Sequence, residues 1–188
     1  PHYRWIVAQP ADTSQQQRFG VPERIIAQVL INRGLHSSED IARFLQPEAV
    51  APVSPFDMPG MHEAVALLRW ALSRGKRIVV YGDYDADGLA GTALMLESLC
   101  SLDGHVKPFI PNRLERGYGL DVGAERGLAS SADVLITVDC GIRAVEEVTL
   151  AKRLGMKVVV TDHHQPPSEL PDADAIVSPR LRGGERFG

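Results

Sequence analysis

The chain has 188 residues, of which 44% are apolar, and it carries a formal net charge of −4. This composition supports a folded core and excludes an intrinsically disordered protein. The acidic balance argues against nucleic-acid binding through a broadly basic surface. It still permits a local basic groove, or metal ions that neutralise acidic residues where a phosphate approaches.

The first 60 residues are predicted to form a small helical appendage. Residues 21–35 (VPERIIAQVLINRGL) place apolar side chains at helical spacing, and Gly34 lies at the end of this helix. A second short helix is predicted to follow, with Ser38 as its N-cap and acidic residues in its first turn. Four prolines between residues 47 and 59 then indicate a linker or an irregular wrap.

From residue 61 onward, helices alternate with short strands rich in β-branched residues. Such alternation predicts an α/β fold with a mostly parallel sheet and helices on both faces. The predicted helices are 62–73, 89–102, 122–128 and 144–154, and the predicted strands are 77–81, 105–110, 133–138, 157–161 and 175–177.

Three of the predicted strands lead directly into carboxylate or imidazole side chains. Ligands bind at the carboxyl ends of the strands in open parallel sheets, so we expect these side chains to converge on one edge. They are Asp83, Asp85 and Asp87 after RIVVY, Asp139 after DVLITV, and Asp162, His163 and His164 after MKVVV.

Each cluster taken alone has a simpler interpretation. The motif DYDADG matches the opening of a calcium loop, but position twelve of that loop would be Leu94, and a strand rather than a helix precedes it. An acidic turn in water is another alternative. Asp139 alone would suit a helix N-cap, and the two histidines alone would suit an exposed surface. Convergence of all three clusters favours a metal site.

Several carboxylates with one or two imidazoles suit Mn²⁺, Mg²⁺ or iron better than an ion that prefers thiolates. Cys140 has no partner cysteine and is interpreted as a packing residue. Five or more donors are too many for one ion at the edge of a protein, which favours a pair of ions. Such pairs activate water and stabilise both the attacking and the leaving oxygen at a phosphorus centre.

Four motifs in this order, GDYDADG, IPNR…GYGL, TVDCG and TDHH, resemble those of the DHH phosphoesterase superfamily. Within it, the chain is most similar to the bacterial exonucleases that degrade single-stranded DNA from 5′ to 3′. The upstream LINRGLHSSEDIARFL also resembles the N-terminal region of these exonucleases, so the likeness covers residues 21–179.

The resemblance implies a role for each motif residue. It implies two Mn²⁺ or Mg²⁺ ions, both contacted by Asp139. The four implied metal ligands are Asp85, Asp87, Asp139 and His163. It implies catalytic roles for Asp139, through the ions, and for His164, which would stabilise charge on the scissile phosphate. Asp83 and Asp162 would orient the ligands, and Arg113 and Tyr118 would help to hold the substrate.

The chain departs from the family pattern in two places. Arg116 stands where the family usually has an acidic residue. Tyr81 stands where many relatives place a metal-binding histidine, which sequences of the exonuclease branch also often lack. The family further supplies another metal-binding Asp downstream and a second domain that closes over DNA. Residues 61–188 would therefore be a DHH domain truncated at its C-terminal end.

The predicted function is a metal-dependent 5′→3′ exonuclease that degrades single-stranded DNA in repair and recombination, with this chain as a fragment of it. Two alternatives stay open: a DHH phosphoesterase acting on pyrophosphate, cyclic dinucleotides or short RNA, and a catalytically silent scaffold domain in a complex of repair or replication proteins.

The expected cellular compartment is the cytoplasm. No apolar run approaches the roughly 20 residues of a membrane helix, and no signal-peptide pattern begins the sequence. Cys100 and Cys140 do not make a disulfide framework, so a reducing environment is expected, with no membrane partner. The start at Pro1 without Met and the end at Gly188 in a glycine-rich stretch also indicate a fragment.

Overall fold

The computed structural model describes residues 4–10, 12, 24–46, 53–112, 120, 127–184 and 187. The chain forms two compact units, residues 1–52 and 53–188. The division falls before the boundary near residue 60 that the prolines suggested, because the segment ahead of that residue packs within the second unit. Met58 shows this packing, because it lies against the apolar core of the second unit.

The first unit contains two short helices, α2 (Arg24–Asn32) and α3 (Ser38–Leu45). Both were predicted, the first from its apolar spacing and the second from its N-cap serine and acidic first turn. The predicted cap of α3 is wrong by one residue, because the Ser37 side chain accepts the hydrogen bond from the Asp40 N–H at 3.0 Å. The buried side chains of this pair of helices are Ala27, Leu30 and Ile41.

The second unit is built on a five-stranded sheet in which every pair of neighbouring strands is parallel. The strand order is β2-β1-β3-β4-β5, so the chain moves outward from β1 in one direction and then returns to build the other side. The strands are β1 (Arg77–Gly82), β2 (His105–Phe109), β3 (Val134–Val138), β4 (Lys157–Thr161) and β5 (Ala175–Val177). The predicted α/β fold is confirmed.

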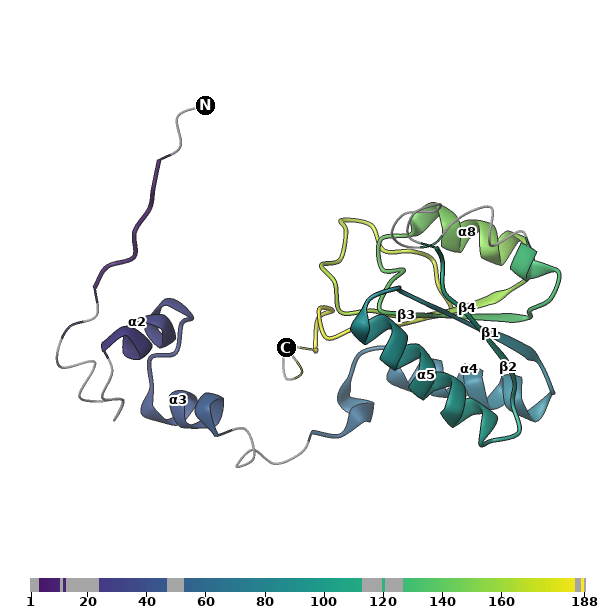
Figure 1. Cartoon of the computed structure of the whole chain (residues 1–188), viewed down its shortest axis with the longest axis horizontal. Coiled ribbons are helices and arrows are strands. Elements are labelled where there is room, and N and C mark those ends of the chain that lie inside the picture. The colour runs from purple at the N-terminus through teal and green to yellow at the C-terminus, as the bar shows by residue number, and fades with distance from the viewer. Residues whose placement is uncertain are drawn as a thin grey trace. The chain divides into compact units, whose positions relative to one another are not determined.

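Helices cover both faces of this sheet, as Figure 1 shows. Helices α4 (Met61–Ser73) and α5 (Ala86–Cys100) lie on one face, and α8 (Val145–Arg153) lies on the other. A short 3₁₀ helix, η2 (Pro55–Asp57), precedes α4. Most of the predicted helix 122–128 lies outside the described residues.

The two faces share the side chains of each strand alternately, as the period of a β-strand requires. On β1, Ile78 and Val80 join the core beneath α4 and α5, whereas Val79 and Tyr81 join the core beneath α8. Strand β3 has five buried residues in sequence, which accounts for its continuous apolar pattern.

No helix within the described residues is both long enough and apolar enough to cross a membrane.

Candidate metal centre

The site is assembled at the carboxyl ends of three adjacent strands, β1, β3 and β4. The first residue after each strand is an aspartate whose N–H donates to the last carbonyl of the next strand in the sheet. These bonds are Asp83 to Val138 (3.2 Å), Asp139 to Thr161 (3.0 Å) and Asp162 to Val177 (3.2 Å). The sheet ladder therefore continues for one step beyond each strand and fixes three aspartates in a row.

The reversal of strand order lies between β1 and β3, since β2 extends the sheet on one side of this point and β4 and β5 extend it on the other. Loops diverge where the strand order reverses, and ligands of open α/β sheets bind in the resulting crevice. Asp83 and Asp139 border this point. The topology alone therefore places the aspartates at the usual binding edge of the fold.

The DYDADG segment forms the entry to α5. Asp85 is the N-cap of α5 and accepts the Gly88 N–H at 3.1 Å, so the helix begins at Ala86, three residues earlier than predicted. Asp87 consequently lies in the first helical turn, where the helix dipole favours a negative charge. The hydrogen bond from Gly88, followed by one involving Asp87, lowers the pKa of Asp85 and keeps it ionised.

Asp139 has an unusual backbone conformation. Its φ angle is +61°, in the left-handed region that non-glycine residues seldom adopt. The turn is held by the buried Thr137 hydroxyl, which donates to the Cys140 carbonyl at 2.7 Å. Asp139 is not the N-cap of α8, because Ala144 has that position. The turn instead places the Asp139 carboxylate over the end of the sheet.

The Asp139 carboxylate is largely buried, with a side-chain exposure of 7%. Burial raises its pKa above the ordinary value, and the neighbouring carboxylate of Asp87 raises it further. An ionised carboxylate in such a place is costly unless a positive charge compensates it. A bound cation would provide that charge.

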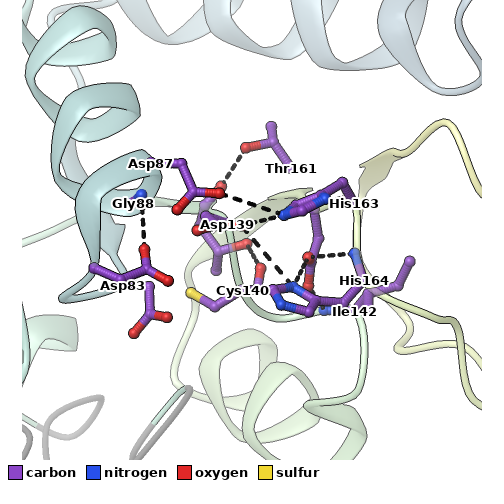
Figure 2. Close-up of polar contacts among 12 residues, drawn as sticks. Asp83, Asp87, Gly88, Asp139, Cys140, Ile142, Thr161, His163 and His164 are labelled. Carbon is purple, nitrogen blue, oxygen red and sulfur yellow. Dashed lines mark hydrogen bonds and ion pairs between the residues drawn. The ribbon is translucent and has the colours of Figure 1, made fainter. Parts of the chain in front are cut away.

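His163 joins the two acidic segments. Its Nε2 lies 2.9 Å from Asp139 Oδ1 and 3.6 Å from Asp87 Oδ2. Figure 2 shows the three side chains pointing toward one another. The ring is more than half exposed, so this convergence is open to solvent. Side chains that follow β1, β3 and β4 thus meet at one point, and His163 is not an isolated surface histidine.

Asp162 supports the second histidine. Its Oδ1 lies 2.7 Å from His164 Nδ1 and accepts the His164 backbone N–H at 3.0 Å, while its Oδ2 accepts the Ile142 N–H at 2.9 Å. The Asp162 side chain is almost completely buried. It therefore orients the His164 ring and ties the loop after β4 to the loop after β3.

In the described ranges, two groups of donors have the proximity that a metal ion requires. One is Asp83, Asp85 and Asp139, and the other is Asp139, His163 and His164; within each group the ligand atoms lie within 4.8 Å of one another. Asp139 belongs to both, which is the arrangement expected of a carboxylate shared by two ions. The oxygen and nitrogen donors fit Mn²⁺ or Mg²⁺.

The geometry also draws in residues to which the sequence assigned supporting roles. Asp83 and His164 each offer a ligand atom within 4.8 Å of one from Asp139. The predicted ligands were Asp85, Asp87, Asp139 and His163, and of these Asp87 belongs to neither group. Cys140 is buried among apolar side chains, and burial raises the pKa of its thiol, which disfavours a thiolate ligand. The predicted substrate residues Arg113 and Tyr118 lie outside the described residues.

Sequence reasoning missed Thr137, whose only signal was a hydroxyl within a buried strand. It also missed the structural requirement for Gly88. An added Cβ at Gly88 would lie 2.7 Å from the Asp83 carbonyl oxygen and 2.8 Å from its carbonyl carbon. These are backbone atoms of the aspartate loop, so they cannot move aside as a flexible side chain can.

We expect Gly88→Ala to destabilise the second unit by about 1–3 kcal/mol, because the added methyl group must displace the Asp83 backbone. The same displacement should weaken Mn²⁺ binding. Thermal unfolding and calorimetric titration with Mn²⁺ measure the two effects. Gly127→Ala is the control, since a Cβ there meets nothing within 4 Å. Equal behaviour of the two variants would show that the loop adapts to a side chain at position 88.

Comparisons with known proteins agree with this geometry. The family model described as "DHH family, N-terminal domain" matches residues 77–185. The chain is 42% identical over 186 residues to the single-stranded-DNA-specific exonuclease RecJ of Bacillus subtilis, covering 96% of this chain and 23% of that protein. It thus spans about a quarter of the length of this curated relative.

Solved structures give the same result. The crystal structure of exonuclease RecJ bound to manganese has a TM-score of 0.66 at 40% identity, covering 73% of this chain and 40% of that one. RecJ from Thermus thermophilus in complex with Mn²⁺ has a TM-score of 0.64 at 35% identity, covering 94% of this chain and 25% of that one. The family match spans more than half of the sequence, and the chain therefore belongs to the DHH family.

Proposed function

We propose that the chain is the metal-binding part of a two-metal-ion phosphodiesterase that removes nucleotides from the 5′ end of single-stranded DNA. The observation that carries this proposal is the position of Asp139 in both donor groups. The similarity to RecJ, named as a single-stranded-DNA-specific exonuclease and solved with manganese, supports the substrate and the Mn²⁺ or Mg²⁺ cofactor.

The proposed mechanism assigns a task to each side chain. A bound pair of divalent ions would supply a hydroxide nucleophile and neutralise the charge that develops on the phosphorus. Asp85 and Asp87 would hold one side of the pair, His163 the other, and Asp139 both. Exposure of His163 leaves the centre accessible to a phosphodiester from solvent.

His164 acts on the substrate in this mechanism. The Asp162 carboxylate lies against His164 Nδ1 and orients the ring. In the proposed mechanism the other ring nitrogen, Nε2, donates to a phosphate oxygen when the ring carries both protons. Such a preorganised donor stabilises the transition state more than the ground state.

The proposed setting is the cytoplasm, with single-stranded DNA as the partner and DNA repair and recombination as the process. The two cysteines support a reducing compartment, since both Cys100 and Cys140 are free thiols.

The test is a substrate panel in Mn²⁺, with EDTA as the blank, for the complete protein of which this chain is proposed to be the metal-binding part. Single-stranded DNA, the same sequence as a duplex, short RNA and pyrophosphate are compared at equal concentrations. We expect mononucleotides to be released from the 5′ end of the single strand, and no release in EDTA. Faster hydrolysis of pyrophosphate or short RNA would assign a different substrate to the same centre. A protein that neither binds Mn²⁺ nor cleaves any of these substrates would favour the scaffold alternative.

A further inference from the structure

Two arginines flank the loop that carries the two histidines. Arg143, in the turn before α8, donates its Nε–H to the Gln165 carbonyl at 2.9 Å. Arg180, in the turn after β5, donates its Nε–H to the His163 carbonyl at 3.3 Å. Residues 163–165 are therefore held from both sides by guanidinium groups that come from different parts of the sheet.

Among the described residues, these contacts use only one nitrogen of each guanidinium. Both arginine side chains are exposed, and within the described part of the chain neither forms an ion pair. A guanidinium that is anchored through Nε keeps its two terminal nitrogens as a planar pair of donors. This fork matches the spacing of two phosphate oxygens.

The negative charge near Arg143 and Arg180 suggests a role for these two side chains. Five carboxylates gather at the carboxyl edge of the sheet: Asp83, Asp85, Asp87, Asp139 and Asp162. Two divalent cations would leave one of these five negative charges uncompensated, so basic side chains along its path would favour the approach of a polyanion. Arg143 and Arg180 are basic residues directly bonded to the histidine loop, one on each side.

Two hollows border the loop. A cleft beside Arg143, of about 440 Å³, is also lined by His164, Gln165 and Glu147. A shallow, open hollow of about 290 Å³ is lined by Asp87, Asp139 and His163, together with Pro179, the residue next to Arg180. A strand of nucleic acid that crosses the metal centre would meet one arginine before it and one after it.

We propose that Arg143 and Arg180 bind the phosphates on either side of the scissile phosphodiester and so set the path of the strand across the metal centre. This proposal rests on the proposed function, since it requires single-stranded DNA to bind at this edge. The bonds to the loop carbonyls keep the two side chains extended, which lowers the entropic cost of phosphate binding.

The experiment measures binding of a hydrolysis-resistant phosphorothioate oligothymidylate, about twelve nucleotides long, by fluorescence anisotropy in Mn²⁺ at several KCl concentrations. Arg143→Ala and Arg180→Ala should each weaken binding by about three- to tenfold. Each should also reduce the slope of log K against log[salt] by about 0.7, the value for one phosphate contact with a single strand. Substitution by lysine at either position should leave the salt slope unchanged and lower the affinity for the oligonucleotide only in part.

Arg153→Ala is the matched control, because Arg153 is an exposed arginine at the far end of α8 and its replacement changes the net charge equally. Calorimetric titration with Mn²⁺ checks that the histidine loop is intact in every variant. If Arg143→Ala and Arg180→Ala lose Mn²⁺ affinity, or bind DNA like Arg153→Ala, the arginines only support the loop and the inference is overturned. If the unaltered chain fails to bind the oligonucleotide, the proposed function itself fails.

Discussion

Asp139→Asn is expected to reduce Mn²⁺-dependent cleavage of single-stranded DNA to below about one hundredth, because removal of one preorganised charge-stabilising group commonly costs about 10²–10³ in rate. Asp139 is the donor common to both groups, so its replacement affects every ion the site can hold. Asparagine tolerates the left-handed backbone at this position, which keeps the turn in place. Calorimetry with Mn²⁺ should show the loss of binding directly.

The same substitution should raise the stability of the metal-free chain. Burial, followed by the Asp87 carboxylate, raises the pKa of Asp139 above its ordinary value of 3.8, so the folded protein holds the proton more tightly than the unfolded chain. The ionised carboxylate therefore opposes folding. Its effect begins as the pH rises through the unfolded pKa and is complete above the raised folded pKa. Near neutral pH, Asp139→Asn should increase the melting temperature in EDTA.

Added Mn²⁺ should reverse this order of melting temperatures, so that the unaltered chain melts above the variant. The reason is that the ion stabilises only a folded chain that binds it. The unaltered chain should gain melting temperature with Mn²⁺, and Asp139→Asn should not. Retention of more than about a tenth of the cleavage rate by the variant would contradict the shared role of this carboxylate. A metal-free variant that melts lower than the unaltered chain would contradict the stability argument.

Asp162→Asn is expected to damage both stability and catalysis. The two oxygens of Asp162 together accept the Ile142 N–H, the His164 N–H and a contact from His164 Nδ1. An asparagine has one oxygen and one NH₂ group, so in either orientation a donor faces a donor. One buried donor left unsatisfied costs about 1–3 kcal/mol, which chemical denaturation will measure.

Catalysis should fall by about 10–100-fold, the usual effect of removing a group that orients a ligand or a reacting histidine. Asp174→Asn is the matched control, because Asp174, just before β5, also accepts a backbone N–H, that of Val158, at the end of β4 opposite to Asp162. It should lower stability and leave Mn²⁺ affinity and kcat unchanged. If the two variants lose activity equally, general destabilisation explains the loss and Asp162 has no specific role toward His164.

Much of this architecture could be predicted from the sequence. The period-two burial of Ile78, Val79, Val80 and Tyr81 is set by the chain itself, and β-α alternation implies a parallel sheet. Parallel strands place their carboxyl ends on one edge, so the convergence of Asp83, Asp139 and Asp162 follows from where the strands end. The predicted fold is confirmed for these local and geometric reasons.

The remaining features depend on particular hydrogen bonds, some within a tight turn and some between distant segments. The left-handed conformation of Asp139 is stabilised by the Thr137 hydroxyl and by the bond to Thr161, and neither can be read from the motif TVDCG. The positions of Arg143 and Arg180 likewise depend on bonds to a loop more than 15 residues away in the sequence. The early start of α5 depends on one capping bond, from Gly88 to Asp85.

The sheet ladder continues into Asp83, Asp139 and Asp162. The position of each aspartate in the active centre therefore depends on the number of residues in the strand before it. Removal of one residue from the middle of β3 would bring Cys140 to the position of Asp139, or would force the whole strand to slip and turn its apolar side chains to the wrong layers. Relatives should therefore vary here by replacing residues, while gains and losses of residues gather in the connections at the far end of the sheet.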